Sequence, residues 1–515
     1  MSDISMNSQI DQLRLKKQRA LAPGSAAAIQ RQHSRGKLTA RERIDYLLDE
    51  GSFQELDMLA RSRANGNNGS DSNPYTDGVI TGFGTIKGKK VCIFSQDFTV
   101  FGGALGEVFA QKIHKVMDLA QSIGVPMIGL NDGAGARIQE GVVALHSYGE
   151  IFSRNVSSSG VIPQISVILG PCAGGAVYSP AMTDFVFMVA STSHMFITGP
   201  DVVKAVTGED VSIEQLGGAL SHASRSGVAT FVADNEFECL DSVAKLLQFL
   251  PSNYLDHPID LPSSDDPMRL IPEFDQLDFN QAYDIKKIIS SLVDDGDFFE
   301  YFSHWARNLV CGFAHIGGQV VGIVANQPQV LSGVLDIDAS EKGARFIRTC
   351  DAFGIAILTI VDVPGFMPGV TQEKNGLVRR GAKLLYAFCE ASVPRVQLIV
   401  HKAYGGAYVM MDSKAIGADL SFAWPSAELA VMDPQGLVDF FHFSPVATLA
   451  PQKKREELIS QYYDSHANPY MAAEMGYIDD VIEPSATRTI LAKAFRTLKD
   501  KKVTSVFKKH PNLPL

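Results

Sequence analysis

The sequence predicts an α/β fold built from two tandem copies of one unit, and a duplicated loop is the main reason. The loop occurs twice with nearly the same residues, as Gly170-Pro-Cys-Ala-Gly-Gly-Ala-Val-Tyr178 and as His401-Lys-Ala-Tyr-Gly-Gly-Ala-Tyr408. An apolar run that ends in aspartate and a glycine-containing turn precedes each copy. Asp132 lies 42 positions before Gly174, and Asp362 lies 43 positions before Gly405. Matching motifs at matching offsets indicate that a unit of about half the chain is duplicated.

Hydrophobic patterning in both halves supports the same fold class. Short apolar runs typical of strands alternate with longer amphipathic runs typical of helices. The expected strands are residues 91–95, 125–130, 165–169, 320–325, 355–361 and 396–400. The expected helices are residues 105–122, 139–155, 343–353 and 378–391. This alternation predicts parallel strands with helices packed on the sheet faces.

The N-terminus and the middle of the chain suggest how the domains are divided. Residues 1–35, rich in Gln, Arg, Lys and Ala, predict a helical arm that packs on a partner or on the domain body. The capping-box pattern Thr39-Ala-Arg-Glu42 then predicts a helix to about Leu48. A proline-rich stretch at 256–280 predicts a linker. We therefore expect two domains, at residues 1–262 with the arm included and at residues 263–515.

Composition excludes several functional classes. A net charge of −11 and a pI near 5.6 argue against nucleic-acid binding, although a local basic patch could still bind a polyphosphate. The six cysteines form no C-x-x-C pair, so neither a metal site nor a disulfide framework is predicted, and a reducing cytoplasm is the simplest location. No signal pattern or apolar run of membrane-spanning length is present.

The two Gly-Gly loops predict chemistry performed by the backbone. Glycine at a strand-to-helix turn can adopt positive φ, and the first N–H groups of the following helix have no acceptor within it. Those groups can donate to an oxygen that gains negative charge. The structural alternative is a close helix–strand contact that needs a small residue, and a matched pair of loops makes that alternative weaker. Two such loops predict a reaction with two oxyanions.

No side chain stands out as a catalyst. His401 and His222 could act as bases in principle, but a lone histidine is more often structural. Gly82-Phe-Gly84 resembles part of a dinucleotide fingerprint, yet Lys87 to Lys90 favours a hairpin turn there.

Charged residues near these motifs are expected to form internal ion pairs or to face solvent rather than to bind a ligand. Arg137 is expected to pair with Asp132 or Glu140 rather than to bind phosphate. Lys112 and Lys115 share a helix face that is expected to be solvated. The acidic residues 294–297 are likewise expected to form a solvated turn.

Several longer motifs resemble one protein family. They are residues 36–43 (GKLTARER), 94–103 (FSQDFTVFGG), 170–184, 325–328 (ANQP), 343–346 (GARF), 361–366 (VDVPGF), 402–408 (KAYGGAY), 467–470 (ANPY) and 476–480 (GYIDD). With these motifs the chain resembles the carboxyltransferase (β) subunits of biotin-dependent acyl-CoA carboxylases, those of propionyl-CoA carboxylases above all. The resemblance extends from about residue 36 to the end.

The resemblance implies a fold, an assembly and partners. The fold would be two crotonase-like domains, each a ββα superhelix. The assembly would be a ring hexamer, with each active site between the N-domain of one subunit and the C-domain of another. The N-half would bind acyl-CoA and the C-half would receive carboxybiotin. Because the chain has no Ala-Met-Lys-Met biotinylation site, biotin would arrive in trans on a biotin carboxylase or biotin carboxyl carrier subunit.

The resemblance also implies residue roles. The catalytic groups would be the backbone amides of two oxyanion holes: Gly174 and Gly175, and Gly406 and Ala407. The substrate and biotin pocket would comprise Ala173, Ala176, Tyr178, Gly405, Tyr408, Val409, Pro364 and Gly365. Carboxybiotin would lose CO2, its ureido anion would take the α-proton, and the resulting enolate would attack CO2. No protein base and no metal would be needed.

Two departures from the family pattern leave alternatives open. Val409 stands where propionyl-type enzymes often have an acidic residue, which predicts a more apolar acyl pocket. Asp433 replaces a common glycine, which predicts a disturbed loop near the site. One alternative function is the equivalent subunit of a sodium-pumping acyl-CoA decarboxylase. The others are a biotin-independent crotonase-type hydratase or isomerase and a non-catalytic ring scaffold.

Overall fold

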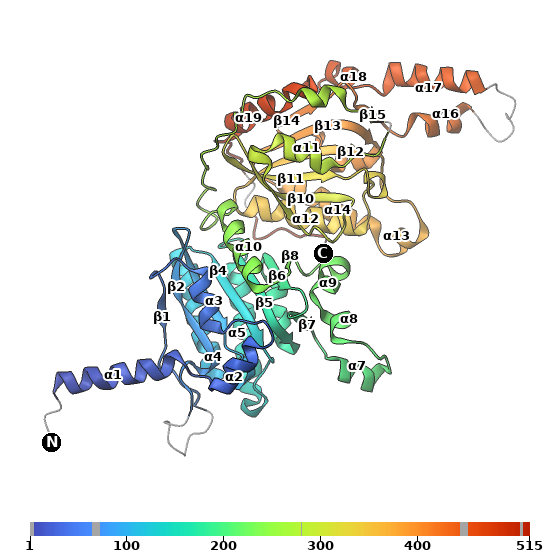
Figure 1. The fold of residues 1–515 in the computed structure, drawn as a ribbon. Coiled ribbons are helices and arrows are strands. Elements are labelled where there is room, and N and C mark those ends of the chain that lie inside the picture. Colours follow the sequence, from blue (N-terminus) through green and yellow to red (C-terminus); the bar gives the residue numbers. More distant parts are fainter. Residues whose placement is uncertain (1–4, 64–72, 280, 443–451, 505–507, 515) are drawn as a thin grey trace. The chain divides into compact units, whose positions relative to one another are not determined.

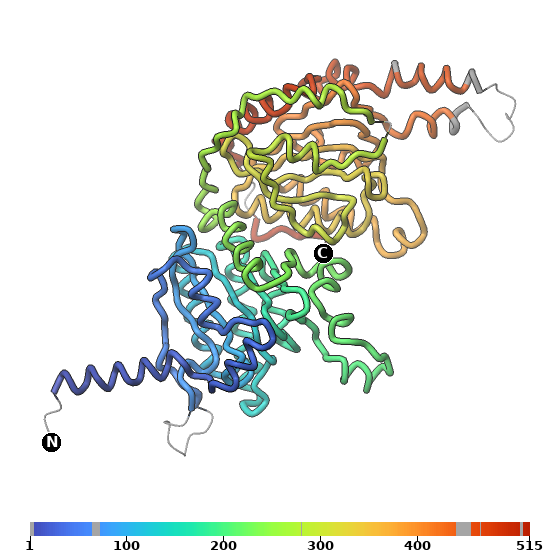
Figure 2. The backbone as a smooth tube through the Cα atoms, viewed as in Figure 1, coloured from blue at the N-terminus to red at the C-terminus, as the bar shows by residue number. Residues whose placement is uncertain are grey.

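A computed structural model describes residues 5–63, 73–279, 281–442, 452–504 and 508–514 (Figure 1). The chain divides into two compact units, Met1–Asp256 and His257–Leu515. The path of the backbone through each unit can be followed in Figure 2.

The first unit is organised around a mixed sheet in the order β1-β2-β3-β4-β5-β6-β8, with β7 paired to β5. Its strands are β1 (Gln54–Leu56), β2 (Val79–Ile86), β3 (Lys89–Gln96), β4 (Met127–Gly133), β5 (Gln164–Ala173), β6 (Phe185–Val189), β7 (His194–Phe196) and β8 (Phe231–Ala233). The first three strands are antiparallel, and from β3 onward every pair is parallel. Gly82 to Gly84 lie within β2, paired with β3, and residues 87–88 form the hairpin turn between the two strands. These glycines do not form a strand-to-helix turn, so the dinucleotide interpretation is not supported.

The second unit repeats this sheet in the order β16-β14-β13-β12-β11-β10-β9, with β15 paired to β13. Its strands are β9 (Phe298–Tyr301), β10 (Leu309–Ile316), β11 (Gln319–Asn326), β12 (Ala356–Val363), β13 (Arg395–Tyr404), β14 (Leu420–Ala423), β15 (Glu428–Ala430) and β16 (Asp480–Val481). Strand pairing shifts register at the same place in both sheets, between Asn131 and Gly133 and between Val361 and Val363. The duplication predicted from the loops is therefore present in the topology.

Helices cover the sheets as the patterning predicts. The principal ones are α3 (Ala40–Leu47), α4 (Glu107–Ile123), α5 (Val142–Ser158), α10 (Glu236–Phe249), α11 (Ile285–Leu292), α12 (Ile337–Ala352), α14 (Leu377–Glu390) and α19 (Thr487–Leu498). The capping box predicted before α3 is formed, because Thr39 and Glu42 each accept from the other's backbone N–H. The core of the second sheet contains apolar side chains from β10 to β14, such as Ile323 and Leu398.

The predicted helical arm consists of α1 (Met6–Leu21) and α2 (Ala26–His33). Most of α1 is exposed, with Ala20 buried, whereas Gln32 near the end of α2 is buried. The chain then continues inward to Lys37, which is 6% exposed. The end of the arm therefore belongs to the core of the first unit.

Two charged groups expected in solvent are buried instead. Lys112 on α4 is 2% exposed and donates to the carbonyl oxygens of Thr76 and Val79. These hydrogen bonds offset the free energy of removing its ammonium from water. Asp294 accepts from the N–H groups of Gly317 and Gly318 and pairs with Arg488 at 2.7 Å. The sequence interpretation was wrong at both positions, because distant segments supply the partners.

Candidate active site

The first Gly-Gly loop begins where β5 ends. Gly174 has φ of +63°, a conformation that costs a side-chain-bearing residue about 1–2 kcal/mol. The chain then turns through Gly174–Val177 into α6 (Tyr178–Met182). The N–H of Tyr178 donates to the Gly175 carbonyl. The N–H groups before it stand at the start of the helical turn, where no acceptor within the turn is available to them. The residues form the amide-rich turn that the sequence predicts.

A buried carboxylate lies directly behind this loop. The Asp132 carboxylate is fully buried at the end of β4. Its Oδ1 lies 2.7 Å from Lys37 Nζ, and its Oδ2 lies 2.9 Å from Arg43 Nη1. A Cβ added at Gly170 would lie 1.9 Å from Asp132 Oδ1 and 2.5 Å from Lys37 Nζ, so this pair occupies the space that a side chain on β5 would take. Two cations thus neutralise the carboxylate at the root of the loop.

Arg137 does not pair with Asp132 but with two other carboxylates. Its guanidinium lies 2.7 Å from Glu140 and 3.0 Å from Asp77. The predicted ion pair with Glu140 is confirmed, whereas Asp132 takes its cations from Lys37 and Arg43 instead. Arg137 is 7% exposed, and its guanidinium is paired with carboxylates of its own unit.

The second Gly-Gly loop repeats the geometry of the first. β13 ends at Tyr404, Gly405 has φ of +59°, and α15 (Gly405–Met410) follows at once. A Cβ at Gly405 would lie 3.0 Å from the Val431 carbonyl oxygen, whereas one at Gly406 would meet nothing within 4 Å. The space beside Gly406 leaves room for a ligand to approach the backbone.

The predicted pocket residues lie around the loop of their own unit. Ala173, Ala176 and Tyr178 flank the first loop, and a Cβ at Gly175 would face the ring of Tyr148 on α5 at 3.6 Å. In the second unit Tyr408 and Val409 follow on α15. Pro364 and Gly365 lie in the turn after β12, where the Gly365 carbonyl accepts from Leu335 N–H.

Ionisable side chains also surround the second loop. His401 Nδ1 lies 3.4 Å from Asp362 Oδ1, and its Nε2 lies 3.6 Å from Glu428 Oε1. The Tyr404 hydroxyl donates to Glu428, and the Tyr283 hydroxyl donates to Asp362 at 2.8 Å. This His401 network (Tyr283, Asp362, His401, Glu428 and Tyr404) reaches the residue that precedes Gly405.

The network holds His401 as a cation rather than as a base. Burial disfavours the imidazolium, but the contacts with Asp362 and Glu428 outweigh it and raise the pKa of His401 from about 6.5 to about 9. The other histidine considered as a base, His222, contacts the Met195 carbonyl at 2.7 Å and the Ser226 hydroxyl at 2.8 Å. Both histidines have structural partners, as the sequence interpretation favoured.

Sequence reasoning missed a second duplicated turn beside each loop. Residues 101–103 and 331–333 all have positive φ, including the non-glycine residues Phe101, Leu331 and Ser332. A Cβ at Gly103 would lie 2.2 Å from the Asp132 carbonyl oxygen, so this turn packs directly on the turn that holds the buried aspartate. The shared pattern V-x-x-G-x-L at residues 100–105 and 330–335 could have revealed it.

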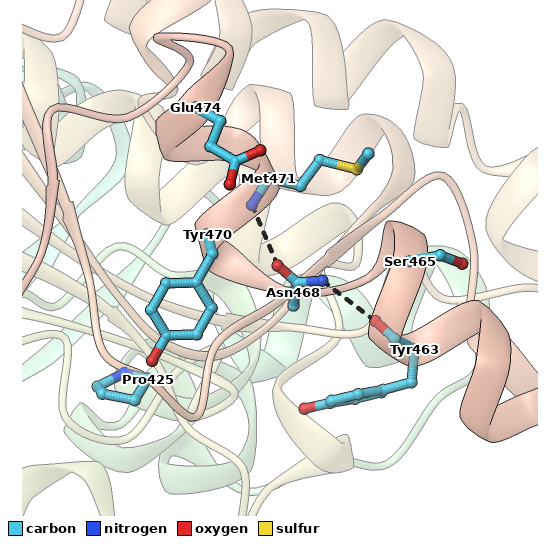
Figure 3. A pocket seen from close by; sticks show the side chains of 7 residues that line it. All are labelled: Pro425, Tyr463, Ser465, Asn468, Tyr470, Met471 and Glu474. Atoms are coloured by element: carbon cyan, nitrogen blue, oxygen red, sulfur yellow. Dashed lines mark hydrogen bonds between the residues drawn. The ribbon is translucent and has the colours of Figure 1, made fainter.

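A cavity of about 430 Å³ lies in the second unit on α17 (Gln452–His466) and α18 (Pro469–Glu474). Its lining comprises Pro425, Tyr463, Ser465, Asn468, Tyr470, Met471 and Glu474 (Figure 3). Asn468 shapes it by accepting from Met471 N–H at 3.1 Å and donating to the Tyr463 carbonyl at 3.4 Å. The ANPY motif therefore forms a helix start and a cavity wall.

Asp433 has a local structural role. Its carboxylate accepts from Gly436 N–H at 2.9 Å, at the start of α16 (Pro434–His442). Aspartate before a helix satisfies an otherwise unpaired N–H in this way. Asp433 thus caps the helix that follows it, and its predicted disturbance of the loop near the site stays a prediction.

Comparison with known proteins agrees with this duplicated architecture. The model of the carboxyl transferase domain family matches residues 31–513. This chain belongs to the carboxyl transferase family. It is 54% identical over 516 residues to the propionyl-CoA carboxylase carboxyltransferase subunit of Haloferax mediterranei, covering 99% of this chain and all of the relative. It is 51% identical over 512 residues to methylmalonyl-CoA decarboxylase subunit alpha of Propionigenium modestum, covering 98% and 99%.

Solved carboxyltransferase structures show the same fold. Transcarboxylase 12S, solved as a hexamer with methylmalonyl-CoA and methylmalonic acid bound, superimposes with a TM-score of 0.95 at 44% identity, covering 99% of both chains. The crotonase-like α/β fold expected from the resemblance is confirmed. As a member of this family the chain is a carboxyltransferase. Within the described residues, no helix is long and apolar enough to cross a membrane.

Proposed function

We propose that this chain transfers a carboxyl group from carboxybiotin to the α-carbon of a short-chain acyl-CoA of the propionyl or acetyl type. The observation that supports it most is the pair of amide-rich turns, each with glycine at positive φ and a buried aspartate behind it. A reaction with two oxyanions, one on the thioester and one on the ureido group, needs such a pair.

We assign one oxygen to each pair of amides by placing acyl-CoA in the N-half and carboxybiotin in the C-half. The Gly174 and Gly175 N–H groups stabilise the enolate oxygen that forms when the acyl thioester loses its α-proton. The Gly406 and Ala407 N–H groups hold the ureido oxygen. Preorganised donors of this kind lower the barrier because they need no reorganisation as charge develops, and each contributes about 3–4 kcal/mol in acyl-transfer enzymes.

We assign biotin to the second turn, because the space beside Gly406 supports that choice. The open space beside Gly406 allows a planar ureido group to reach the backbone, which a side chain there would obstruct. When bound, carboxybiotin supplies the carboxyl group and the ureido nitrogen that accepts the α-proton. The protein's part is to hold both partners in position and exclude water. The cofactor would be delivered by a biotin carboxylase or biotin carboxyl carrier subunit, and we propose a homo-hexamer in the cytoplasm as the working form.

Reverse carboxyl transfer tests this function directly. Purified protein would be incubated with free biotin and either malonyl-CoA or methylmalonyl-CoA, and loss of the carboxylated thioester would be followed. We expect loss that depends on biotin, with the ratio of the two rates reporting the acyl preference. Biotin-independent loss alone, or no loss even with a biotinylated carrier protein, would contradict the proposal.

The decarboxylase relative supports a second candidate. Methylmalonyl-CoA decarboxylase subunit alpha matches over nearly the whole chain, and a decarboxylase would run the same half-reaction in reverse. The direction depends on the partner subunits. Co-purification with a membrane subunit, and methylmalonyl-CoA consumption that depends on Na⁺, would favour the decarboxylase.

Substitution of Val409 tests the acyl pocket. Val409 is 36% exposed on α15, two residues after the proposed amide of Ala407. Val409→Asp places a charge in the proposed pocket wall, and we expect the ratio of kcat/KM for the longer and the shorter acyl-CoA to change by about tenfold or more. Val503→Asp, at a 52% exposed position beyond α19, is the control and should leave the ratio unchanged. An unchanged ratio in Val409→Asp would remove this residue from the pocket.

A further inference from the structure

The two halves neutralise equivalent buried aspartates in different ways. Asp132 and Asp362 occupy the same place, at the register shift of β4 and of β12. In the first half the cations come from Lys37 and Arg43, which precede the sheet in sequence. In the second half the cation comes from His401, on β13 itself.

The duplicated loops place these cations at one structural position. His401 stands four residues before Gly405, just as Gly170 stands four residues before Gly174. At Gly170 an added side chain would collide with Lys37 Nζ, so lysine fills the space that the imidazole occupies in the other half. Both cations contact Oδ1 of their aspartate. Arg43 adds a permanent charge beside Asp132 in the first half, whereas His401 in the second half is titratable.

The His401 network connects this charge to the turn. Glu428 on β15 contacts His401 Nε2 and accepts from the Tyr404 hydroxyl, and the backbone of Tyr404 leads directly into Gly405. The ring of Phe279 stacks on His401 with centroids 4.9 Å apart. Asp362 also accepts from Lys402 N–H at 3.1 Å, which fixes the strand one residue beyond His401.

We propose that His401 is a positioning residue for the second oxyanion site: as an imidazolium between Asp362 and Glu428, it holds Tyr404 so that the turn at Gly405 keeps the Gly406 and Ala407 amides in place. This rests on the proposed function. When the imidazolium loses its proton, the buried Asp362 and the partly buried Glu428 have no cation between them, and the hold on Tyr404 weakens. The rate of carboxyl transfer therefore falls at alkaline pH, because deprotonation of His401 loosens the turn that carries the amides.

The direction of the pH effect follows from the groups that face His401. Asp362 and Glu428 favour its charged form. The other polar groups act on these two carboxylates: the Tyr283 hydroxyl donates to Asp362, the Tyr404 hydroxyl donates to Glu428, and the charge of Lys402 also favours ionised Glu428. A pKa raised from about 6.5 to about 9 means that the stabilising contribution is fully present below pH 6.5. It is lost as the pH rises through about 9.

The test compares wild type, His401→Gln and His401→Arg in the reverse-transfer assay from pH 7 to 10, with biotin-free blanks to subtract thioester hydrolysis. Wild-type kcat should fall about tenfold by pH 10, one unit above the His401 pKa of about 9. His401→Gln should have kcat lowered about tenfold or more at pH 7, with that alkaline fall absent. His401→Arg keeps the cation and should restore activity while removing the fall. The KM for acyl-CoA should change little, because the first loop is untouched.

A second readout does not depend on turnover. The difference in Tm between wild type and His401→Gln should shrink as the pH rises from 6.5 to 9.5, and the same difference measured for His401→Arg against His401→Gln should stay constant. The proposal is overturned if His401→Gln keeps the wild-type alkaline fall in kcat, or if the first Tm difference does not depend on pH. If no variant and no wild type turns over, the proposed function fails, and the Tm comparison still decides the role of His401.

Discussion

Replacing Gly405 by alanine is expected to reduce kcat for carboxyl transfer by about 10²–10³-fold, the loss typical of removing an oxyanion-hole donor. The residue has φ of +59°, and a Cβ would lie 3.0 Å from the Val431 carbonyl oxygen. Relief of this strain rotates the turn and redirects the Gly406 and Ala407 N–H groups. The measurement is kcat in the reverse-transfer assay, together with the KM for acyl-CoA, which should change much less.

A matched control separates backbone strain from catalysis. Gly476 has φ of +73°, and a Cβ there would meet nothing within 4 Å. Gly476→Ala therefore introduces similar strain, of about 1–2 kcal/mol, away from both loops. If Gly405→Ala and Gly476→Ala retained equal activity, the amides after Gly405 would have no catalytic role. Gly174→Ala, with φ of +63° and its nearest atom 4.0 Å from the new Cβ, tests the first loop in the same way.

Loss of the Arg43 guanidinium should destabilise the first unit more than any other single charge removal proposed here. Arg43 is fully buried and lies 2.9 Å from Asp132 and 2.7 Å from Glu236. Arg43→Met leaves two buried carboxylates short of a cation, and breaking such a pair costs about 3–5 kcal/mol. We expect the urea midpoint to fall accordingly, with carboxyl transfer reduced because Asp132 lies behind the first loop.

An exposed ion pair of the same unit provides the comparison. Arg154 contacts Asp118 at 2.7 Å, with exposed side-chain fractions of 26% and 57%. Arg154→Met should therefore cost no more than about 1 kcal/mol, because water and salt screen the pair. Equal shifts of the urea midpoint for Arg43→Met and Arg154→Met would show that burial does not strengthen the Arg43 network.

The candidate site was predictable to the extent that it is made of backbone. The turns at Gly174 and Gly405 were found from sequence because a positive φ favours glycine and a helix start follows from the next few residues. The neighbouring turns at 101–103 and 331–333 were missed because three of their positive-φ positions carry side chains, and a glycine pattern does not reveal them.

The charges around the site could not be placed from sequence. Lys37 and Asp132 are 95 positions apart, and Arg43 and Glu236 are 193 apart. Lys112 was interpreted as solvated because it shares a helix face with Lys115, yet the carbonyl oxygens that bind it belong to residues 76 and 79. Such pairings depend on which segments the sheet brings together.

The duplication, the alternation of strands and helices, and the two glycine turns could all be predicted from the amino-acid sequence, because each is specified by residues close together in the chain. The neutralisation of the buried aspartates, by Lys37 and Arg43 in one unit and by His401 in the other, became visible only in the folded chain. The physical reason is that a buried carboxylate needs a cation close in space, and closeness in space is set by packing rather than by position in the chain.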